Sequence, residues 1–236
     1  MMRDDVPAAF DLIVHFHVGK PAEEDYRASG VRAVVACADH GLFAKAYGDA
    51  YDNDSQFTKV VEDISALVRA KTGHLGAHPA RIALVAWSAG YGAVRKVLQQ
   101  RASEIDTVIL LDGLHTAYRY QGRRKMIDGR DLEPFVAFAR EAAEGRKLMV
   151  VTHSDIVPRD YPSTTDTANA LIEAVGATRV RSEKPAVTLT PTTRADRENF
   201  HVRGFAGETK EAHIAQLHLV LMALHEYLVP RWRNQE

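Results

Sequence analysis

The chain has 236 residues, of which 46% are hydrophobic, so it can bury one sizeable core and we expect one domain over residues 1–236. Its formal net charge is −1, with acidic and basic residues interspersed, which gives no basic face for nucleic acid. No apolar run approaches the roughly 18 to 20 residues that cross a bilayer, so we expect no membrane span.

The N-terminal residues and the cysteine content indicate a cytoplasmic protein. Residues 1–10 lack the apolar centre of a signal peptide and lead directly into a strand pattern. Cys37 has no second cysteine to pair with, so a disulfide framework within the chain is not possible. Because it lies in an apolar run, we expect Cys37 to be a small residue of the core.

Six short apolar runs alternate with helical patterns along the chain. Near-continuous apolar strands of this kind are typical of a parallel sheet that helices cover on both faces. We therefore expect an α/β fold with three layers, doubly wound around a mostly parallel sheet of about six strands. The predicted strands cover 10–16, 31–37, 81–86, 106–111, 147–152 and 199–205.

Three helices have clear boundaries in the sequence. One begins with Asp54 or Ser55 as its N-cap, continues with an apolar stripe that includes Leu67, and ends before Gly73. The second begins with the capping-box pair Ser163 and Asp166 and ends at Gly176. The third has its apolar face at three- and four-residue spacing and stops at Pro230; the residues on that face are Ile214, Leu217, Leu221, Leu224 and Leu228.

The turn after the third predicted strand has a single serine, Ser88, between small residues. A nucleophile elbow requires small neighbours because its serine has a strained backbone between a strand and a helix. Ala86 replaces the first glycine of the usual G-x-S-x-G pattern. The alternative role of Ser88, as a simple helix N-cap, is disfavoured by the small residues that follow it.

Polar residues follow every predicted strand. In an open parallel sheet the carboxyl ends of the strands meet at one edge, where ligands bind. The residues at the strand ends are His15, His17, Val18 and Gly19; Asp39 and His40; Ser88; Asp112 and His115; His153 and Asp155; and His213. We therefore expect the functional site at this edge.

A serine hydroxyl becomes a useful nucleophile when an imidazole takes its proton and a carboxylate orients that imidazole. Ser88, either Asp112 or Asp155, and His213 occur in the chain order that α/β hydrolases use. The anionic intermediate needs two backbone donors, which we assign to the N–H groups of Ala89 and Val18. This chemistry requires neither a cofactor nor a metal.

The chain resembles the α/β-hydrolase superfamily, and more narrowly a group of small bacterial α/β hydrolases. The segments that carry the resemblance are HFHVG at 15–19, WSAGYG at 87–92, LDGLH at 111–115, YPSTTDTA at 161–168 and FHVRGFAGETKEAH at 200–213. Two leading strands of the larger hydrolases are missing, which implies a minimal fold without a large cap domain. The resemblance favours Asp112 over Asp155 as the acid.

Several other residues have two interpretations each. We expect His17, Gly19, Trp87, His115 and His153 to contact a small ester substrate, although hydrogen bonding behind the site is the favoured role of His115 and His153. One of His15 and His17 is expected to be a core imidazole. The segment 118–130 is either a small lid with cationic groups for an anionic substrate or, as we favour, a solvated loop.

The main functional hypothesis is a serine esterase that cleaves a carboxylic ester or thioester through an acyl-enzyme. A metal-dependent hydrolase is the first alternative, because side chains at the strand ends could supply ligands: His15, His17, Asp39, His40, Asp112, His115 and His153. A non-catalytic binding protein on a hydrolase scaffold is the second. The sequence does not specify the substrate or the oligomeric state.

Overall fold

The computed structural model describes residues 1–3, 5–183 and 188–235, and its centre is an eight-stranded sheet. The strand order is β2-β1-β3-β4-β7-β10-β9-β8. All six predicted strands are present and parallel: β1 (Ala9–Phe16), β2 (Val34–Ala38), β3 (His78–Trp87), β4 (Thr107–Leu111), β7 (Leu148–His153) and β10 (Phe200–Phe205).

The prediction of about six strands was wrong by two strands, which extend the sheet beyond β10. β9 (Pro191–Arg197) pairs antiparallel with β10, and β8 (Arg179–Arg181) pairs antiparallel with β9. Both lie between the predicted helix that ends at Gly176 and the predicted strand at 199–205, where no element was predicted. β8 and β9 are held largely by backbone hydrogen bonds and bury little apolar surface, so their sequences carry a weak strand pattern.

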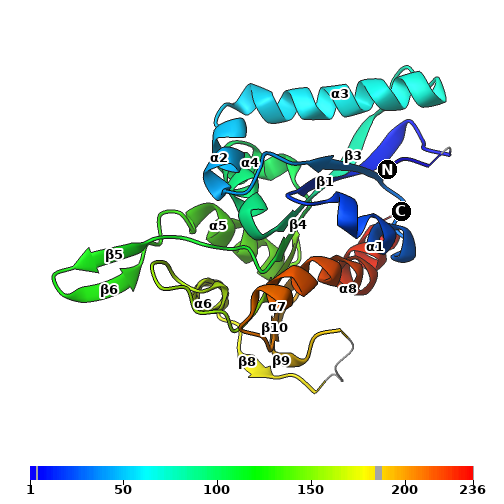
Figure 1. Ribbon diagram of the computed structural model, residues 1–236. Helices are drawn as coiled ribbons and strands as arrows, with labels where there is room; N and C mark the ends of the chain where they lie inside the picture. Colours follow the sequence, from blue (N-terminus) through cyan, green and yellow to red (C-terminus); the bar gives the residue numbers. More distant parts are fainter. Residues whose placement is uncertain (4, 184–187, 236) are drawn as a thin grey trace.

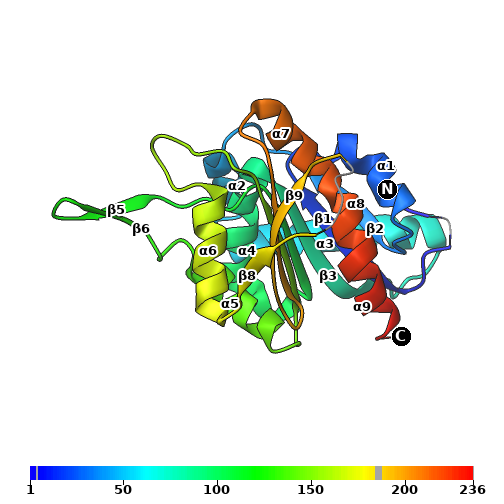
Figure 2. The same cartoon turned by 90° about the horizontal axis from the view of Figure 1, so that it is seen from below.

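Helices cover both faces of the sheet, which gives three layers (Figures 1 and 2). One face packs against α3 (Asp54–Thr72), α4 (Tyr91–Arg101), α5 (Glu133–Ala143) and α6 (Thr164–Val175), with α2 (Ala44–Ala50) beside α4. The other face packs against α1 (Glu23–Ala28) and the C-terminal helical segments. The sheet residues alternate between the two cores, as Leu12 and Ile13 do on β1.

The predicted helix boundaries are largely confirmed. Ser163 and Asp166 form the capping box of α6, and Gly176 ends that helix in the left-handed conformation. Gly73 ends α3 in the same way, but the N-cap of α3 is Asn53. The predicted apolar stripe of α3 included Leu67, which was wrong, because Leu67 is 64% exposed.

The C-terminal helix does not stop at Pro230. It runs through α7 (Lys210–Ala215), a 3-10 turn, α8 (Leu219–Ala223), a π-helical turn (Leu224–Leu228) and α9 (Val229–Arg233). The π turn restarts the hydrogen-bond pattern, so Pro230 falls in the first turn of α9, where its missing N–H costs nothing. Ile214, which was predicted to lie on the buried apolar face of this helix, is exposed.

Cys37 is exposed on the edge strand β2, which corrects the prediction of a core residue. The prediction of a strand here was right, but β2 is at the edge of the sheet, paired with β1, and its outer part is open to solvent. Within the described residues, no helix is long and apolar enough to cross a membrane.

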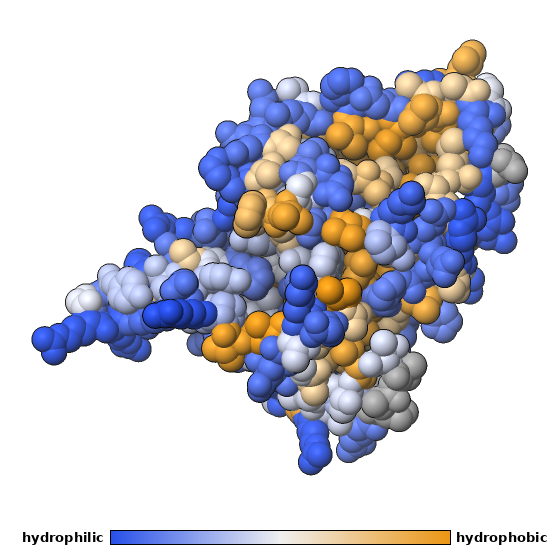
Figure 3. Space-filling model, viewed as in Figure 1, coloured by the Kyte–Doolittle hydropathy of each residue, from blue (hydrophilic) through white to orange (hydrophobic). Residues whose placement is uncertain are grey.

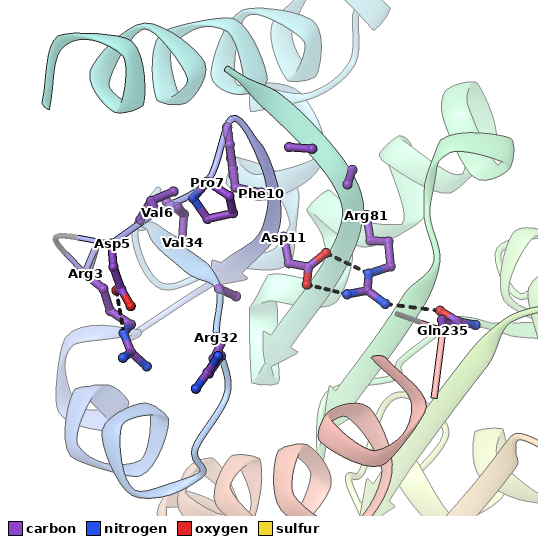
Figure 4. Close-up of a pocket in the computed structure, with 13 residues that line it drawn as sticks. Arg3, Asp5, Val6, Pro7, Phe10, Asp11, Arg32, Val34, Arg81 and Gln235 are labelled. Carbon is purple, nitrogen blue, oxygen red and sulfur yellow. Dashed lines mark hydrogen bonds and ion pairs between the residues drawn. The ribbon is translucent and has the colours of Figure 1, made fainter. Parts of the chain in front are cut away.

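Arg81 joins the amino ends of β1 and β3 by an ion pair with Asp11 and contacts α9 by a hydrogen bond. Arg81 donates from Nε and Nη2 to the two carboxylate oxygens of Asp11, at 2.7 and 2.6 Å (Figure 4). Its Nη1 donates to the carbonyl oxygen of Trp232 at 2.8 Å. A cavity of about 640 Å³ lies here. It is at the opposite end of the strands from Ser88.

Candidate active site

Ser88 lies in a 3-10 turn, Ser88–Gly90, between the end of β3 and the start of α4. Its φ of 48° is in the left-handed region, which a non-glycine residue adopts only where its surroundings hold it there. Two glycines make room for this turn. A Cβ at Gly90 would lie 2.4 Å from the carbonyl oxygen of Phe16, and one at Gly113 would lie 2.4 Å from that of Ser88. The small residues around Ser88 are thus a packing requirement.

Ser88, His213 and Asp112 form a continuous hydrogen-bonded chain. Nε2 of His213 is 2.9 Å from Oγ of Ser88, and Nδ1 of His213 is 2.7 Å from Oδ2 of Asp112. Asp112 comes directly after β4, and His213 lies on α7. The carboxyl ends of β3 and β4 and the C-terminal helix therefore bring together three residues that are far apart in the sequence.

Asp112 is buried, and both its carboxylate oxygens are occupied. Oδ1 accepts hydrogen bonds from the Ser154 backbone N–H at 2.9 Å, the Ser154 hydroxyl at 3.1 Å and the Thr164 hydroxyl at 2.6 Å. Burial raises the pKa of Asp112, but the hydrogen bonds from His213 and Thr164 outweigh burial and hold the pKa below its ordinary value. A carboxylate in this environment stays ionised beside His213.

Sequence reasoning gave no role to Ser154 or Thr164. Ser154 was visible as a polar residue after a strand, next to the rival acid Asp155. Thr164 lies beside the predicted N-cap Ser163, so the start of α6 itself delivers a donor to Asp112. Asp155 is exposed, and its backbone N–H donates to the Gly207 carbonyl at 3.0 Å.

Trp87 lies between two imidazole rings. Its indole is stacked on His17, with ring centroids 5.1 Å apart, and packs against His213 at 4.9 Å. The indole Nε1 also donates to the backbone carbonyl of His213 at 3.0 Å. Trp87 is 9% exposed, so it supports His213 from beneath rather than opening to solvent.

On the far side of Trp87, His17 is part of a second network. Nδ1 of His17 lies 2.9 Å from the Tyr47 hydroxyl, which donates to Oδ1 of Asp39 at 2.7 Å. The Tyr47 hydrogen bond is the largest of the effects that lower the pKa of Asp39, to which the Gly41 and Val18 N–H groups also contribute. Burial lowers the pKa of His17.

The loop after β1 has an unusual backbone. His17 and Val18 have φ values of 73° and 54°, and a positive φ is a genuine outlier for a β-branched residue such as valine. Gly19 follows, where a Cβ would lie 2.4 Å from Sγ of Cys37. The loop is therefore held in a strained shape beside the Ser88 turn.

His15 and His153 are buried behind the site. Nδ1 of His15 is 2.8 Å from the Tyr26 hydroxyl, and burial lowers the pKa of His15 to about 4. Nε2 of His153 accepts from Arg179 at 2.8 Å, and burial, helped by the charge of Arg179, lowers the pKa of His153 to about 4. His15 is thus the core imidazole of the pair His15 and His17.

Two cavities open beside Ser88. The larger, of about 700 Å³, extends from Ala89 past Tyr91 and Ala117. The smaller, of about 330 Å³, contains His213, Asp112 and Ile156. His115 and Tyr161 line both. Of the residues expected to contact substrate, His115 lines these cavities, whereas His17, Gly19, Trp87 and His153 lie outside their walls.

The side chains considered for a metal site are engaged in separate networks. His15 contacts Tyr26, His17 and Asp39 share Tyr47, Asp112 contacts His213, and His153 contacts Arg179. Within residues 1–3, 5–183 and 188–235, no three His, Cys, Asp or Glu side chains converge in a way that could hold a metal ion.

Comparison with solved structures finds similar folds at low sequence identity. Est1E from Butyrivibrio proteoclasticus aligns with a TM-score of 0.51 and 13% identity over 98% of this chain and 92% of its own. An uncharacterised protein from Capnocytophaga ochracea DSM 7271 aligns with a TM-score of 0.50 and 12% identity over 95% of this chain and 57% of its own. This chain thus spans a little over half of the second protein.

An acetyl xylan esterase from Aspergillus awamori aligns more weakly, with a TM-score of 0.46 and 8% identity over 92% of each chain. No protein-family model matches the sequence, and a comparison with curated proteins gives no match. The similarity to the first two structures concerns the fold alone. It supports the expected fold class, an α/β fold with a mostly parallel sheet between helices.

Proposed function

We propose that this protein is a serine hydrolase that cleaves a carboxylic ester or thioester through an acyl-enzyme. The observation that carries the proposal is the chain from the Ser88 hydroxyl through both nitrogens of His213 to Asp112, with distances of 2.9 and 2.7 Å. A nucleophile within hydrogen-bond reach of a base that a third group orients is the geometry that covalent acyl transfer requires.

The proton moves along this chain in two directions. As Ser88 Oγ attacks the carbonyl carbon, its proton passes to Nε2 of His213, while Nδ1–H remains bonded to Asp112. When the intermediate collapses, the bond to the leaving oxygen or sulfur breaks, and Nε2 returns the proton to that atom. Water then attacks the Ser88 ester as Nε2 of His213 takes its proton. When this second intermediate collapses, the acid leaves and Nε2 returns the proton to Ser88 Oγ.

The negative charge on the tetrahedral oxygen requires donors on the side away from His213. We assign the Ala89 N–H, which follows the strained Ser88 at the start of the turn, and the Val18 N–H from the loop after β1. The positive φ of Val18 is the support for a functional role of that loop. The Val18 N–H contributes to the low pKa of Asp39 as a donor to that carboxylate, so in this role it would exchange its bond to Asp39 for one to the substrate oxygen.

The remaining predicted residues fit positioning roles in this proposal. Trp87 holds the His213 backbone through its indole N–H, and His17 packs on the other face of the indole. His153 reaches Asp112 indirectly, since its Nδ1 lies 2.9 Å from the Thr165 hydroxyl, which donates to the Ser154 carbonyl. His115 lines both cavities and is the one of the five expected contact residues that faces substrate.

The proposal is tested by hydrolysis of short-chain 4-nitrophenyl esters with and without a chelator. We expect turnover that a chelator leaves unchanged and that Ser88→Ala abolishes. Turnover that the chelator removes and Ser88→Ala leaves intact would favour the metal-dependent alternative. No turnover on any ester or thioester, from a folded protein, would favour the binding-protein alternative.

A further inference from the structure

The antiparallel pair β5 (Tyr118–Gln121) and β6 (Arg124–Ile127) forms a hairpin that projects away from the body of the molecule (Figure 1). We refer to residues 118–127 as the arm. Its outer end is hydrophilic (Figure 3). A two-stranded hairpin without a covering layer is marginally stable by itself, so a partner that packs on it would add stability.

The arm is strongly cationic. It contains four basic residues, Arg119, Arg123, Arg124 and Lys125, and no acidic residue. In the part of the chain that the structure describes, none of these four forms an ion pair. In the large cavity beside Ser88, by contrast, the cations are neutralised: Arg95 by Asp131, Lys96 by Asp52 and Lys45 by Asp49. The charge of the arm is thus available for a partner.

The residues at the base of the arm show the same contrast. Arg130 forms a close ion pair with Asp128 at 2.6 Å, and its hydrogen bonds hold the pKa of Asp128 at about 2. Arg130 therefore adds no net charge here. The excess of positive charge belongs to the projecting part alone.

Two tyrosines lie on one face of the arm. The register pairs Tyr118 with Ile127 and Tyr120 with Lys125, so both rings are on the same face, two residues and about 7 Å apart. The Lys125 ammonium lies 3.5 Å from the centre of the Tyr118 ring, and Tyr120 is 67% exposed. Because the Lys125 ammonium covers one face of the Tyr118 ring, the exposed Tyr120 is the ring that can stack on a sugar, with cations nearby for the carboxylate of that sugar.

The base of the arm is part of the candidate active site. The Thr116 hydroxyl donates to the Asp128 carbonyl at 2.8 Å, and the Asp128 N–H donates to the Ala117 carbonyl at 2.9 Å, which closes the base. Thr116 and Ala117 line the same 700 Å³ cavity as Ser88. A molecule that lies along the arm therefore continues into the cavity where the ester would be cleaved.

We propose that the arm binds an anionic polysaccharide that carries the ester, so that the substrate is a polymer with free carboxylates. This inference rests on the proposed esterase function and names its substrate class. An anionic membrane fits less well. The tip, Gln121-Gly122-Arg123, is polar, and the apolar residues Met126 and Ile127 are half-buried near the base, where they could not enter a bilayer.

The test compares two pairs of charge-removing substitutions. Arg123→Gln with Arg124→Gln alters the arm, and Arg32→Gln with Arg233→Gln removes the same charge from exposed positions at the opposite end of the strands. Binding is measured as retardation in gels that contain polygalacturonate. Release of methanol or acetate is measured on partially methyl-esterified and partially O-acetylated polygalacturonate, which separates esters of the polymer's carboxyl groups from those of its hydroxyls.

We expect the arm pair to lose retardation and to raise KM on one of the two polymers about tenfold with little change in kcat, as loss of electrostatic attraction would. Added salt should reduce the wild-type advantage. The control pair should behave as wild type, and 4-nitrophenyl acetate turnover should be unchanged in both pairs. That last measurement reports the proposed function separately, because it does not involve the arm.

Equal effects of the two pairs, or no effect of either, would overturn the inference. The inference would also be overturned if the protein sedimented with phosphatidylglycerol vesicles but was not retarded by the polymer. The same holds if the arm substitutions changed the oligomeric state and left polymer binding as in wild type. If the wild-type protein is retarded by the polymer but does not hydrolyse 4-nitrophenyl acetate, the esterase proposal is overturned and the arm remains a polyanion-binding surface.

Discussion

Two histidine–aspartate pairs flank Trp87, and they differ in burial and in contact. Asp112 is 1% exposed and lies 2.7 Å from His213. The Asp39 side chain is 60% exposed and lies 3.9 Å from Nδ1 of His17, and the Tyr47 hydroxyl is hydrogen-bonded to both His17 and Asp39. Both imidazoles pack on the same indole. His213 reaches a serine hydroxyl with its second nitrogen, at 2.9 Å.

The difference shows what turns a histidine–aspartate pair into a candidate proton relay. Buried donors keep Asp112 ionised and leave one oxygen for His213, so the tautomer of His213 is fixed with its lone pair toward Ser88. Solvent screens Asp39, and the Tyr47 hydroxyl stands between it and His17. We assign catalysis to the first pair and loop positioning to the second.

The largest expected effect comes from removing the charge of each aspartate in turn. Asp112→Asn should lower kcat about 10⁴-fold, because an amide N–H facing Nδ1 forces the wrong tautomer on His213. Asp39→Asn and Asp155→Asn should change kcat less than about threefold, since neither carboxylate contacts His213. The measurement is kcat on 4-nitrophenyl acetate. A near-wild-type rate for Asp112→Asn would sink the assignment of the acid.

A smaller effect is expected at the indole that the two pairs share. Trp87→Phe keeps a ring between the imidazoles but removes the N–H that holds the His213 carbonyl. A lost hydrogen bond of about 1 kcal/mol predicts a fall in kcat of about fivefold with KM unchanged.

The control for this prediction is Trp232→Phe. It removes a comparable indole bond, to Asp106 at 2.8 Å, and should alter stability without altering kcat. Equal kcat values for the two variants would show that the Trp87 hydrogen bond does not position His213.

Much of this arrangement could be predicted from the sequence, and the limits have physical causes. Strands buried on both faces must be apolar throughout, so the six parallel strands and the Ser88 turn were visible. β8 and β9 were not, because these two strands at the margin of the sheet bury few side chains and are held mainly by backbone hydrogen bonds. Pro230 was assigned as a stop because the π turn that accommodates it leaves no sequence pattern.

The choice of the acid shows the same limit at the site. Asp112 and Asp155 both follow strands at the same edge, and sequence position does not say where a side chain points. The structure directs Asp112 toward His213 because Ser154 and Thr164 hold its other oxygen. Ser154 follows β7 and Thr164 begins α6, so no local pattern predicts that they meet at Asp112.

A buried histidine lies behind each histidine–aspartate pair. These two histidines, His153 and His15, should make the stability of the fold sensitive to acid. His153 and His15 have pKa values of about 4 in the folded state, against about 6.5 when unfolded. The unfolded chain therefore binds more protons between pH 6.5 and 4, so stability is complete above about pH 6.5 and falls as pH decreases through this range.

Thermal unfolding from pH 7 to pH 4 measures this dependence. A loss of each kcal/mol should lower Tm by about 2 to 4 °C. His153→Gln should flatten the dependence, whereas His74→Gln, which alters an exposed histidine, should leave it as in wild type. A slope that both variants leave unchanged would contradict a role for the buried imidazole.

The smallest effect is expected beside His17. Val18→Gly should relieve a left-handed conformation that costs a β-branched residue about 1 kcal/mol. The greater freedom of glycine in the unfolded chain opposes this gain in stability. We therefore expect Tm to change by only a few degrees while kcat falls, because the proposed amide donor is less rigidly held. Unchanged kcat would remove Val18 from the proposed oxyanion site.

The central claim is that Ser88, activated by His213 and Asp112, is the nucleophile. The most direct measurement is to treat the protein with a fluorophosphonate and locate the adduct by peptide mass spectrometry. We predict a single adduct on Ser88, formed in wild type and strongly slowed in Asp112→Asn. An adduct on another residue, such as Ser154, or none on a folded protein, would contradict the account.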